Sequence, residues 1–258
     1  MRTNIKKAIL VGTGKGGVGK SSFSILLALE LISKGNKVGL MDCDVSGPSI
    51  PKILGLKNGI KGDPKRGIIP PSTVDGLKVF STELFMNDKK TCVLWDGDRV
   101  HEYITKSMED INWGADIDYL IADLPPGSGS SPQAIIEFIK ENKISTGLVL
   151  ITTPQDVAMN DILKSISMAD KLEIPVLGIV ENMSVFVCPK CNEIHHLFGK
   201  GKVSSTCMKE NLNYLGYIPL IPELSVVSDI SLNMKTIPAE IKPYISIITT
   251  NILKSLGD

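Results

Sequence analysis

Five short apolar runs recur along the chain and have the length of β-strands. Each shows little alternation between apolar and polar positions, which is typical of parallel strands buried on both faces of a sheet. The runs are AILVG from Ala8, VGLMD from Val38, YLIAD from Tyr119, GLVLIT from Gly147 and VLGIVEN from Val176.

Segments with helical spacing of their apolar residues lie between these runs. The alternation of strand and helix predicts an α/β fold with a doubly wound, mostly parallel sheet flanked by helices. A chain of 258 residues is at the upper end for one domain, and we expect a single domain over residues 1–258. The predicted helices are Lys20–Ser33, Ser131–Asn142, Asp156–Lys171 and Ile241–Leu256.

Two regions interrupt the alternation. Residues 56–74 carry many glycines, prolines and charges, and they predict a long surface excursion. Residues from about 185 to 202 contain a Cys-x-x-Cys pair followed by HHLFGKGK, and we expect an insertion that carries the two cysteines. Neither region is long enough for a separate domain.

The charges balance, with 28 Lys and Arg against 28 Asp and Glu, so no global field favours nucleic acid or anionic lipid. The first apolar run ends in glycines and has no signal-peptide cleavage site, and no stretch approaches the roughly 18 apolar residues of a membrane helix. The five cysteines are an odd, sparse set unlike a secreted disulfide framework. We expect a cytoplasmic protein with no nucleic-acid or membrane partner.

A glycine-rich stretch, GTGKGGVGKSS, links the first predicted strand to the first predicted helix. Gly12, Gly14 and Gly17 fit the dinucleotide pattern G-x-G-x-x-G. Asp42, at the end of the second predicted strand, would then be the ribose-binding acid. This pattern alone is weak, so a dinucleotide site is one of two interpretations.

The second interpretation is a P-loop, G-x-x-x-x-G-K-[ST], which gives Lys20 and Ser21 tasks that the dinucleotide pattern does not. Lys20 would reach the outer phosphates, Ser21 would bind magnesium, and backbone amides would cradle the anion. Asp123, at the end of the third run, stands where P-loop enzymes have a carboxylate that orients metal-bound water. We therefore predict an ATP and Mg²⁺ site whose nucleotide contacts are Gly14, Lys15, Gly16, Gly17, Val18, Gly19, Lys20, Ser21 and Ser22.

Beyond the loop, the chain resembles the deviant Walker A ATPases of the MinD/Mrp type, within the SIMIBI class of P-loop NTPases. Among these it is most similar to the Mrp/ApbC ATP-binding iron–sulfur carriers. The resemblance spans nearly the whole chain and rests on long motifs in the family's order. They are KGGVGKSS from Lys15, MDCDVSGPSIPKILG from Met41, DLPPGSG from Asp123, TTPQDVA from Thr152, ENMS from Glu181 and CPKC from Cys188.

The resemblance implies catalytic roles for three residues. Lys15 is the signature lysine that crosses a dimer interface to the partner's nucleotide, Lys20 is the P-loop lysine, and Asp44 positions the attacking water. Phosphoryl transfer needs these parts, because it depends on charge neutralisation, a metal and an oriented water. The remaining implied contacts are magnesium for Asp42 and Asp123 and adenine for Asn182.

Two positions depart from the family pattern. After DLPPG the family often has an acid where this chain has Ser130, and Asp96 replaces a basic residue after Trp95. We expect both changes to affect partner contacts or dimer geometry more than nucleotide binding.

Cys188 and Cys191 form a C-x-x-C pair, which suits zinc, an iron–sulfur cluster or a redox disulfide. Two thiolates do not complete a four-coordinate site, so either His195 and His196 or a second subunit must contribute. A symmetric dimer would bring four thiolates together at a two-fold axis. That arrangement suits a [4Fe-4S] cluster bridged between subunits, as the resemblance implies, and zinc is the alternative.

The first functional hypothesis is an ATP-hydrolysing homodimer, slow in turnover, that assembles iron–sulfur clusters or delivers them to apo iron–sulfur proteins. The second is a MinD/ParA-like switch with a structural zinc or unligated C-x-x-C. A membrane-bound switch needs a basic amphipathic C-terminus, and the last 19 residues contain only two lysines. The third is a reductase or chelatase ATPase, a class whose cluster cysteines are not an adjacent C-x-x-C.

Overall fold

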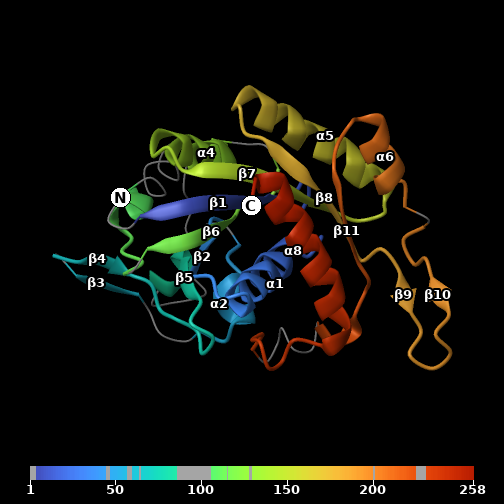
Figure 1. Cartoon of the computed structure of the whole chain (residues 1–258), viewed down its shortest axis with the longest axis horizontal. Coiled ribbons are helices and arrows are strands. Elements are labelled where there is room, and N and C mark those ends of the chain that lie inside the picture. The colour runs from blue at the N-terminus through green and yellow to red at the C-terminus, as the bar shows by residue number, and fades with distance from the viewer. Residues whose placement is uncertain are drawn as a thin grey trace.

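The computed structural model describes residues 4–44, 47–56, 60–63, 65–85, 106–114, 116–127, 130–199, 201–224 and 231–258. A seven-stranded sheet lies at its centre in the order β11-β8-β7-β1-β6-β2-β5 (Figure 1). The chain begins in the middle at β1, moves to one edge through β2 and β5, returns at β6 and crosses to the other edge. Its strands are β1 (Ile5–Gly12), β2 (Val38–Asp42), β5 (Lys78–Ser81), β6 (Ile117–Asp123), β7 (Ser145–Thr152), β8 (Val176–Asn182) and β11 (Tyr214–Ile218).

Every pair of neighbouring strands in this sheet is parallel. The predicted doubly wound α/β class is therefore confirmed. The carboxyl ends of β1, β6 and β2 lie side by side at the same end of the sheet. This is where the direction of winding reverses. Ligands of such folds bind at this reversal.

Helices cover both faces of the sheet (Figure 1). The apolar residues of α1 and α8 pack on one face, and those of α4, α5 and α6 pack on the other. Two of the four predicted helices, α1 and α5, have the predicted bounds; α4 begins and ends one residue earlier than predicted, and α8 begins one residue later. The helices are α1 (Lys20–Ser33), α2 (Ile50–Ile53), α4 (Ser130–Glu141), α5 (Asp156–Lys171), α6 (Val203–Lys209) and α8 (Lys242–Leu256), with the 3₁₀ helices η1 (Thr82–Phe85) and η2 (Ala239–Ile241).

In the residues that the structure describes, two antiparallel hairpins lie outside the main sheet. The first, β3 (Lys61–Asp63) with β4 (Gly67–Ile69), falls in the predicted surface excursion. The second, β9 (Phe186–Val187) with β10 (Ile194–His195), falls in the predicted insertion and projects from the body beyond β8 and β11 (Figure 1).

The two edge strands, β5 and β11, are absent from the five predicted runs. β5 has only four residues, too few for a run to stand out. β11 alternates between buried and exposed positions, and Gly216, with a φ of 134°, coincides with a break in its register with β8. An edge strand needs less apolar burial than a central strand, so continuous hydrophobicity does not mark it.

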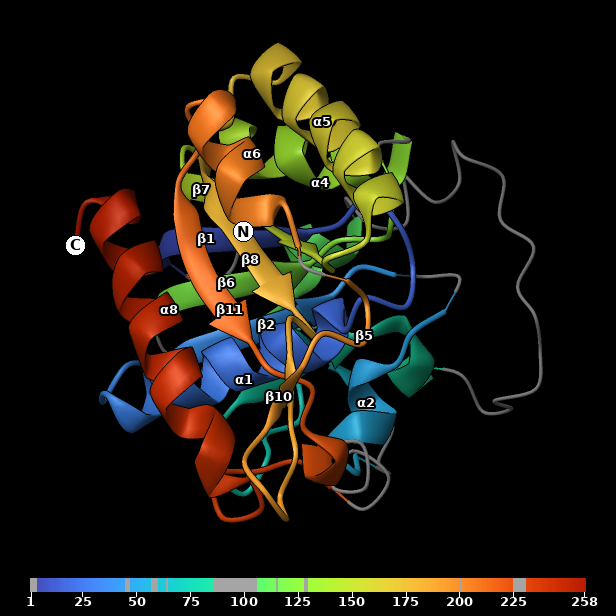
Figure 2. The same cartoon turned by 90° about the vertical axis from the view of Figure 1, so that its right-hand side faces the viewer.

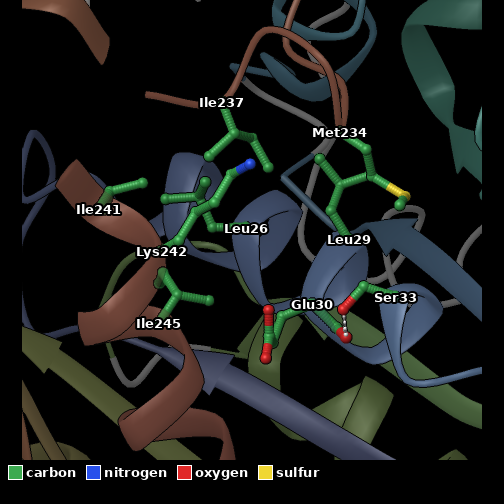
Figure 3. Close-up of a pocket in the computed structure, with 9 residues that line it drawn as sticks. All are labelled: Leu26, Leu29, Glu30, Ser33, Met234, Ile237, Ile241, Lys242 and Ile245. Atoms are coloured by element: carbon green, nitrogen blue, oxygen red, sulfur yellow. Dashed lines mark hydrogen bonds between the residues drawn. The ribbon is translucent and has the colours of Figure 1, made fainter. Parts of the chain in front are cut away.

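A small cavity of about 130 Å³ lies between α1 and α8 (Figure 3). Leu26 and Leu29 of α1 face Ile241 and Ile245 across it, so its character is largely apolar. It shares no lining residue with the phosphate-loop cavity described below, and we interpret it as a gap in helix packing.

Candidate nucleotide and cluster sites

The phosphate loop links β1 to α1 at the reversal point of the sheet. Gly17 and Gly19 have φ angles of 79° and 82°, which side-chain-bearing residues rarely adopt. Gly19 immediately precedes α1, whose amino end carries a partial positive charge. All residues from Lys15 to Ser22 line a cavity of about 270 Å³, and its size and lining fit a bound phosphate chain.

Gly14 contributes shape to the loop and does not line this cavity. A Cβ at this position would lie 2.5 Å from the carbonyl carbon of Asp161 in α5. The glycine therefore allows the loop to approach a helix of the opposite layer. Of the predicted loop contacts from Gly14 to Ser22, Gly14 is the one that does not line the cavity.

Lys20 and Asp123 form a buried ion pair beneath the loop. Lys20 Nζ lies 2.6 Å from Asp123 Oδ2, with 8 % of the lysine side chain and none of the aspartate exposed. The contact lacks hydrogen-bond geometry, and the ammonium has no hydrogen-bond partner among the residues that the structure describes. Its N–H donors are therefore available to an anionic ligand in the cavity.

Two hydroxyl groups of α1 donate to the same carboxylate. Ser21 Oγ lies 2.7 Å from Asp123 Oδ2, and Ser24 Oγ lies 2.6 Å from Asp123 Oδ1. Ser21 and Asp123 were both predicted near magnesium, whereas Ser24 was missed because it lies outside the P-loop pattern. Hydroxyl and carboxylate oxygens are hard ligands, so the residues present fit Mg²⁺.

Asp42 is the register partner of Asp123 on the neighbouring strand. It is almost fully buried and accepts hydrogen bonds from Ser81 Oγ and the Asp44 backbone N–H, both at 3.2 Å. Burial, followed by the charge of Asp123, raises the pKa of Asp42 to about 7, and Lys20 opposes that rise. Two buried carboxylates with one lysine leave excess negative charge when both ionise, which favours a divalent cation.

Asp44 follows the end of β2 and lines the phosphate-loop cavity. Its Oδ1 accepts the Gly47 backbone N–H at 3.0 Å. The strand ends at Asp42, which stays buried beside Asp123, while Asp44 lies beyond the strand pleat at the cavity. Because the strand ends before Asp44, the alternation of side chains along a strand does not force the two acids to opposite faces of the sheet.

Asn182 is the last residue of β8 and forms a hydrogen bond with the phosphate loop. Its Nδ2 donates to the Val18 carbonyl at 2.8 Å, and its Oδ1 accepts the Met183 N–H at 3.0 Å. A Cβ on Gly19 would lie 2.4 Å from Asn182 Nδ2, so this contact is close. Asn182 does not line the cavity, and its implied contact with adenine stays a prediction.

Lys15 lines the cavity and contacts its own chain. Its ammonium donates to Gln155 Oε1 at 2.6 Å, and Gln155 immediately precedes α5. Thr13 Oγ1 donates to the Lys15 carbonyl at 3.1 Å. Sequence reasoning missed Gln155, although it stands inside the TTPQDVA motif.

The cysteine pair lies at the turn of the β9–β10 hairpin. The Cys188 backbone N–H donates to the Glu193 carbonyl at 2.9 Å, and the Asn192 N–H donates to the Cys188 carbonyl at 2.8 Å. Hydrogen bonds from the backbone N–H groups of Lys190 and Cys191 lower the pKa of the Cys188 thiol. Cys188 is half-buried and Cys191 is exposed. The turn therefore presents two accessible thiols, one of which is stabilised as thiolate.

The two histidines do not complete a metal site with these thiols. His195 in β10 lies with its ring 6.3 Å from the ring of Phe186, and His196 lines a separate cavity with Glu181. In the described ranges, no three or more His, Cys, Asp or Glu side chains are grouped to hold a metal ion. One chain thus offers two thiols on this hairpin.

Other sequence expectations lie beyond what the structure describes. Asp96 falls outside the described residues, and the side chain of Ser130 is not described, so the two family departures stay untested. No described helix has the length and apolar character to cross a membrane.

Comparisons with known proteins show the family of the chain. Residues 4–253 match the ParA family description of NUBPL iron-transfer P-loop NTPases. An iron–sulfur cluster carrier protein of Methanococcus maripaludis is 38% identical over 98% of this chain and 86% of its own length. A cytosolic Fe–S cluster assembly factor, a NUBP2 homolog of Dictyostelium discoideum, is 40% identical over 90% of this chain and 88% of its length.

A solved structure is also similar. A nucleotide-binding protein of Archaeoglobus fulgidus, in complex with ADP, superposes with a TM-score of 0.76 at 34% identity, covering 93% of this chain and 92% of that one. The P-loop interpretation is thereby favoured over the dinucleotide one. The chain belongs to the ParA family of NUBPL-type iron-transfer P-loop NTPases.

Proposed function

We propose that this chain is an ATP-dependent iron–sulfur cluster carrier. It binds and slowly hydrolyses Mg–ATP, forms a homodimer, holds a [4Fe-4S] cluster between two C-x-x-C pairs and delivers it to apo iron–sulfur proteins. One observation carries the proposal: a P-loop NTPase of an iron-transfer family presents two accessible thiols, and only two, on a projecting hairpin.

The nucleotide half of the function is built from the buried charges. Lys20 would balance the outer phosphates with donors that have no hydrogen-bond acceptor in the described chain. Ser21, Asp42 and Asp123 would hold Mg²⁺, which supplies charge neutralisation on the phosphates during transfer. Asp44, at the cavity wall, would accept a hydrogen bond from the attacking water and orient it.

The cluster half needs a second subunit. Cluster cysteines bind as thiolates, and the backbone N–H groups around Cys188 favour that form. A four-iron cluster takes four thiolates, twice what one hairpin provides. A two-fold axis next to the hairpin turn would supply the other pair, and the exposure of Cys191 leaves room for a second hairpin to approach.

A short connection joins the two halves. Asn182 donates to Val18 in the phosphate loop, and Phe186, which starts the hairpin, follows it by only four residues. Ser184, between them, donates its backbone N–H to Ile218 at the end of β11. A nucleotide that moves the loop therefore acts on the root of the hairpin, which supports control of the cluster by ATP.

The MinD/ParA-like switch has less support. Ile245, Ile248 and Ile252 of α8 are buried in the core on the sheet face. These side chains are committed to the fold, so α8 does not offer its apolar face to a membrane.

Anaerobic reconstitution with iron and sulfide tests the proposal. We expect about one four-iron cluster per two chains, because four thiolates complete one cluster. Cys188→Ser should lose nearly all of it, since a dimer would retain two of four ligands, and His195→Ala serves as the matched control that keeps it. A colourless protein with zinc in each chain, lost in His195→Ala, would contradict the cluster and leave the ATPase standing.

A further inference from the structure

A groove of about 470 Å³ runs beside the cysteine hairpin. Phe186 and Val187 of β9 form one wall, Leu220 and Ile221 after β11 form another, and Tyr244 at the start of α8 closes it. Figure 2 shows the hairpin beside the carboxyl end of β11 and the first turns of α8. The volume is within the range of about 300–1,000 Å³ typical of ligand pockets.

Several contacts fix the walls of the groove. The Leu220 backbone N–H donates to the Val185 carbonyl at 2.7 Å, which ties the segment after β11 to the root of the hairpin. Tyr244 packs its ring 5.3 Å from the ring of Tyr217. Pro189, Pro219 and Pro222 add lining with restricted backbone freedom. A pre-formed groove of this kind costs little ordering entropy when a partner binds.

The groove has an acidic lining. Glu223 and Glu240 both line it, both are exposed, and no lysine or arginine is part of the lining. Neither carboxylate forms an ion pair with another residue in the described parts of the chain. A partner complementary to this surface is therefore apolar with a positive charge.

The groove is also continuous with the cysteine turn. Pro189 and Asn192 line it, and they flank the segment that ends in Cys191. A segment bound in the groove would rest against the same turn that carries the thiols. A protein that takes over a cluster must bring its own thiolates within bonding distance of iron, so the groove is placed where such a protein has to dock.

We propose that this groove binds an extended, apolar segment with lysine or arginine from the protein that receives the cluster. The assignment rests on the proposed carrier function. Apolar side chains of the segment would contact Phe186, Leu220 and Tyr244, and its basic side chain would pair with Glu223 and Glu240.

The test uses the full chain and a fluorescent peptide that alternates isoleucine with lysine, together with a matched peptide in which glutamate replaces lysine. Fluorescence anisotropy should show binding of the basic peptide only. Replacing Glu223→Lys together with Glu240→Lys should weaken that binding on the order of tenfold or more. The control is Glu137→Lys with Glu141→Lys on α4, two exposed acids on the opposite side of the molecule, which should bind as wild type (Figure 1).

Cluster loading and ATP hydrolysis are measured on the same proteins, and both should be unchanged in the Glu223→Lys/Glu240→Lys variant. Equal binding of the two peptides, or unaltered binding by that variant, overturns the groove assignment. If wild type does not bind the peptide and that variant changes its oligomeric state, the groove assignment is also overturned. The groove would then be a contact with a second copy of the chain. If wild type binds the peptide but loads no cluster, the carrier function fails and the groove remains a peptide site.

Discussion

The Lys15 ammonium donates a 2.6 Å hydrogen bond to Gln155 Oε1, so the first lysine of the phosphate loop is held by the residue that precedes α5. If Lys15 reaches the nucleotide of a partner, it has to leave Gln155. A net hydrogen bond contributes about 0.5–1.5 kcal/mol. A symmetric dimer would release two such bonds, so Gln155→Ala should tighten the ATP-dependent dimer by roughly fivefold to a hundredfold, measured by sedimentation with a non-hydrolysable analogue.

Gln155→Glu and Lys15→Ala are the companion variants. Glutamate would strengthen the hold on Lys15 through a charge-assisted bond and weaken the dimer. Lys15→Ala should bind ATP nearly as wild type but lose both ATP-induced dimerisation and most hydrolysis. If all three variants have the same dimer population as wild type, Lys15 has no role in dimerisation and is an ordinary surface lysine.

Removal of the Lys20 charge should abolish ATP binding, because this ammonium has unused donors at the cavity and would balance the phosphates. Isothermal titration calorimetry of Lys20→Met against wild type measures this directly. The substitution leaves Asp123 without its ion-pair partner, so a thermal melt must show that the variant is folded. Asp44→Asn is the matched variant: it should bind ATP and hydrolyse it slowly. Unchanged affinity in Lys20→Met would defeat the P-loop assignment.

The stability of the protein without nucleotide or magnesium should fall as pH rises through 7. Asp42 has its pKa raised from 3.8 to about 7 in the fold, so the folded state binds a proton that the unfolded state releases. The stabilisation is complete below the unfolded pKa and is lost as pH increases through the folded one. Melting temperatures measured from about pH 5 to pH 8 should decline in wild type, with most of the decline below pH 7, and stay flatter in Asp42→Asn. Mg–ATP should offset the decline, since a cation compensates the ionised pair.

The sequence was sufficient for the parts of the site that lie in one motif. Lys20 and Ser21 are adjacent, and Asp123 is recognisable because it ends an apolar run. It was insufficient for contacts between distant segments: Gln155 reaches Lys15 across 140 positions, and Ser24 is one turn beyond the pattern that identified Ser21. No periodicity encodes such pairings, because they depend on how the sheet brings loop ends together.

The same limit applies to the fold and to the cysteines. Central strands are buried on both faces and stand out as apolar runs, whereas β11 alternates and contains a glycine-linked irregularity. Cys188 and Cys191 are evident from spacing, but the spacing does not show what would complete a site with them. In the proposed dimer the other two ligands would come from a second subunit, which leaves no mark in the spacing of one chain.

The last prediction concerns the loop glycines. Steric clash and backbone strain act at different glycines, so their effects on stability can be measured separately. A Cβ on Gly14 would lie 2.5 Å from the Asp161 carbonyl carbon, so Gly14→Ala must displace the loop or α5 and should cost about 1–3 kcal/mol or more. Gly17 has open space but a φ of 79°, and Gly17→Ala should cost about 1–2 kcal/mol from strain alone. Gly16 has neither constraint, so Gly16→Ala should leave folding unchanged or stabilise it by up to about 1 kcal/mol.

Urea unfolding of the three variants without nucleotide measures this order. Gly16→Ala is the control for adding a methyl group to the loop, and calorimetry with ATP then separates folding from binding. Gly14→Ala should also weaken ATP binding, although Gly14 does not line the cavity, because a displaced loop no longer presents Lys15 to Ser22 in one arc. Equal stability of Gly14→Ala and Gly16→Ala would show that the loop does not depend on its close approach to α5, and the role given to Gly14 would be wrong.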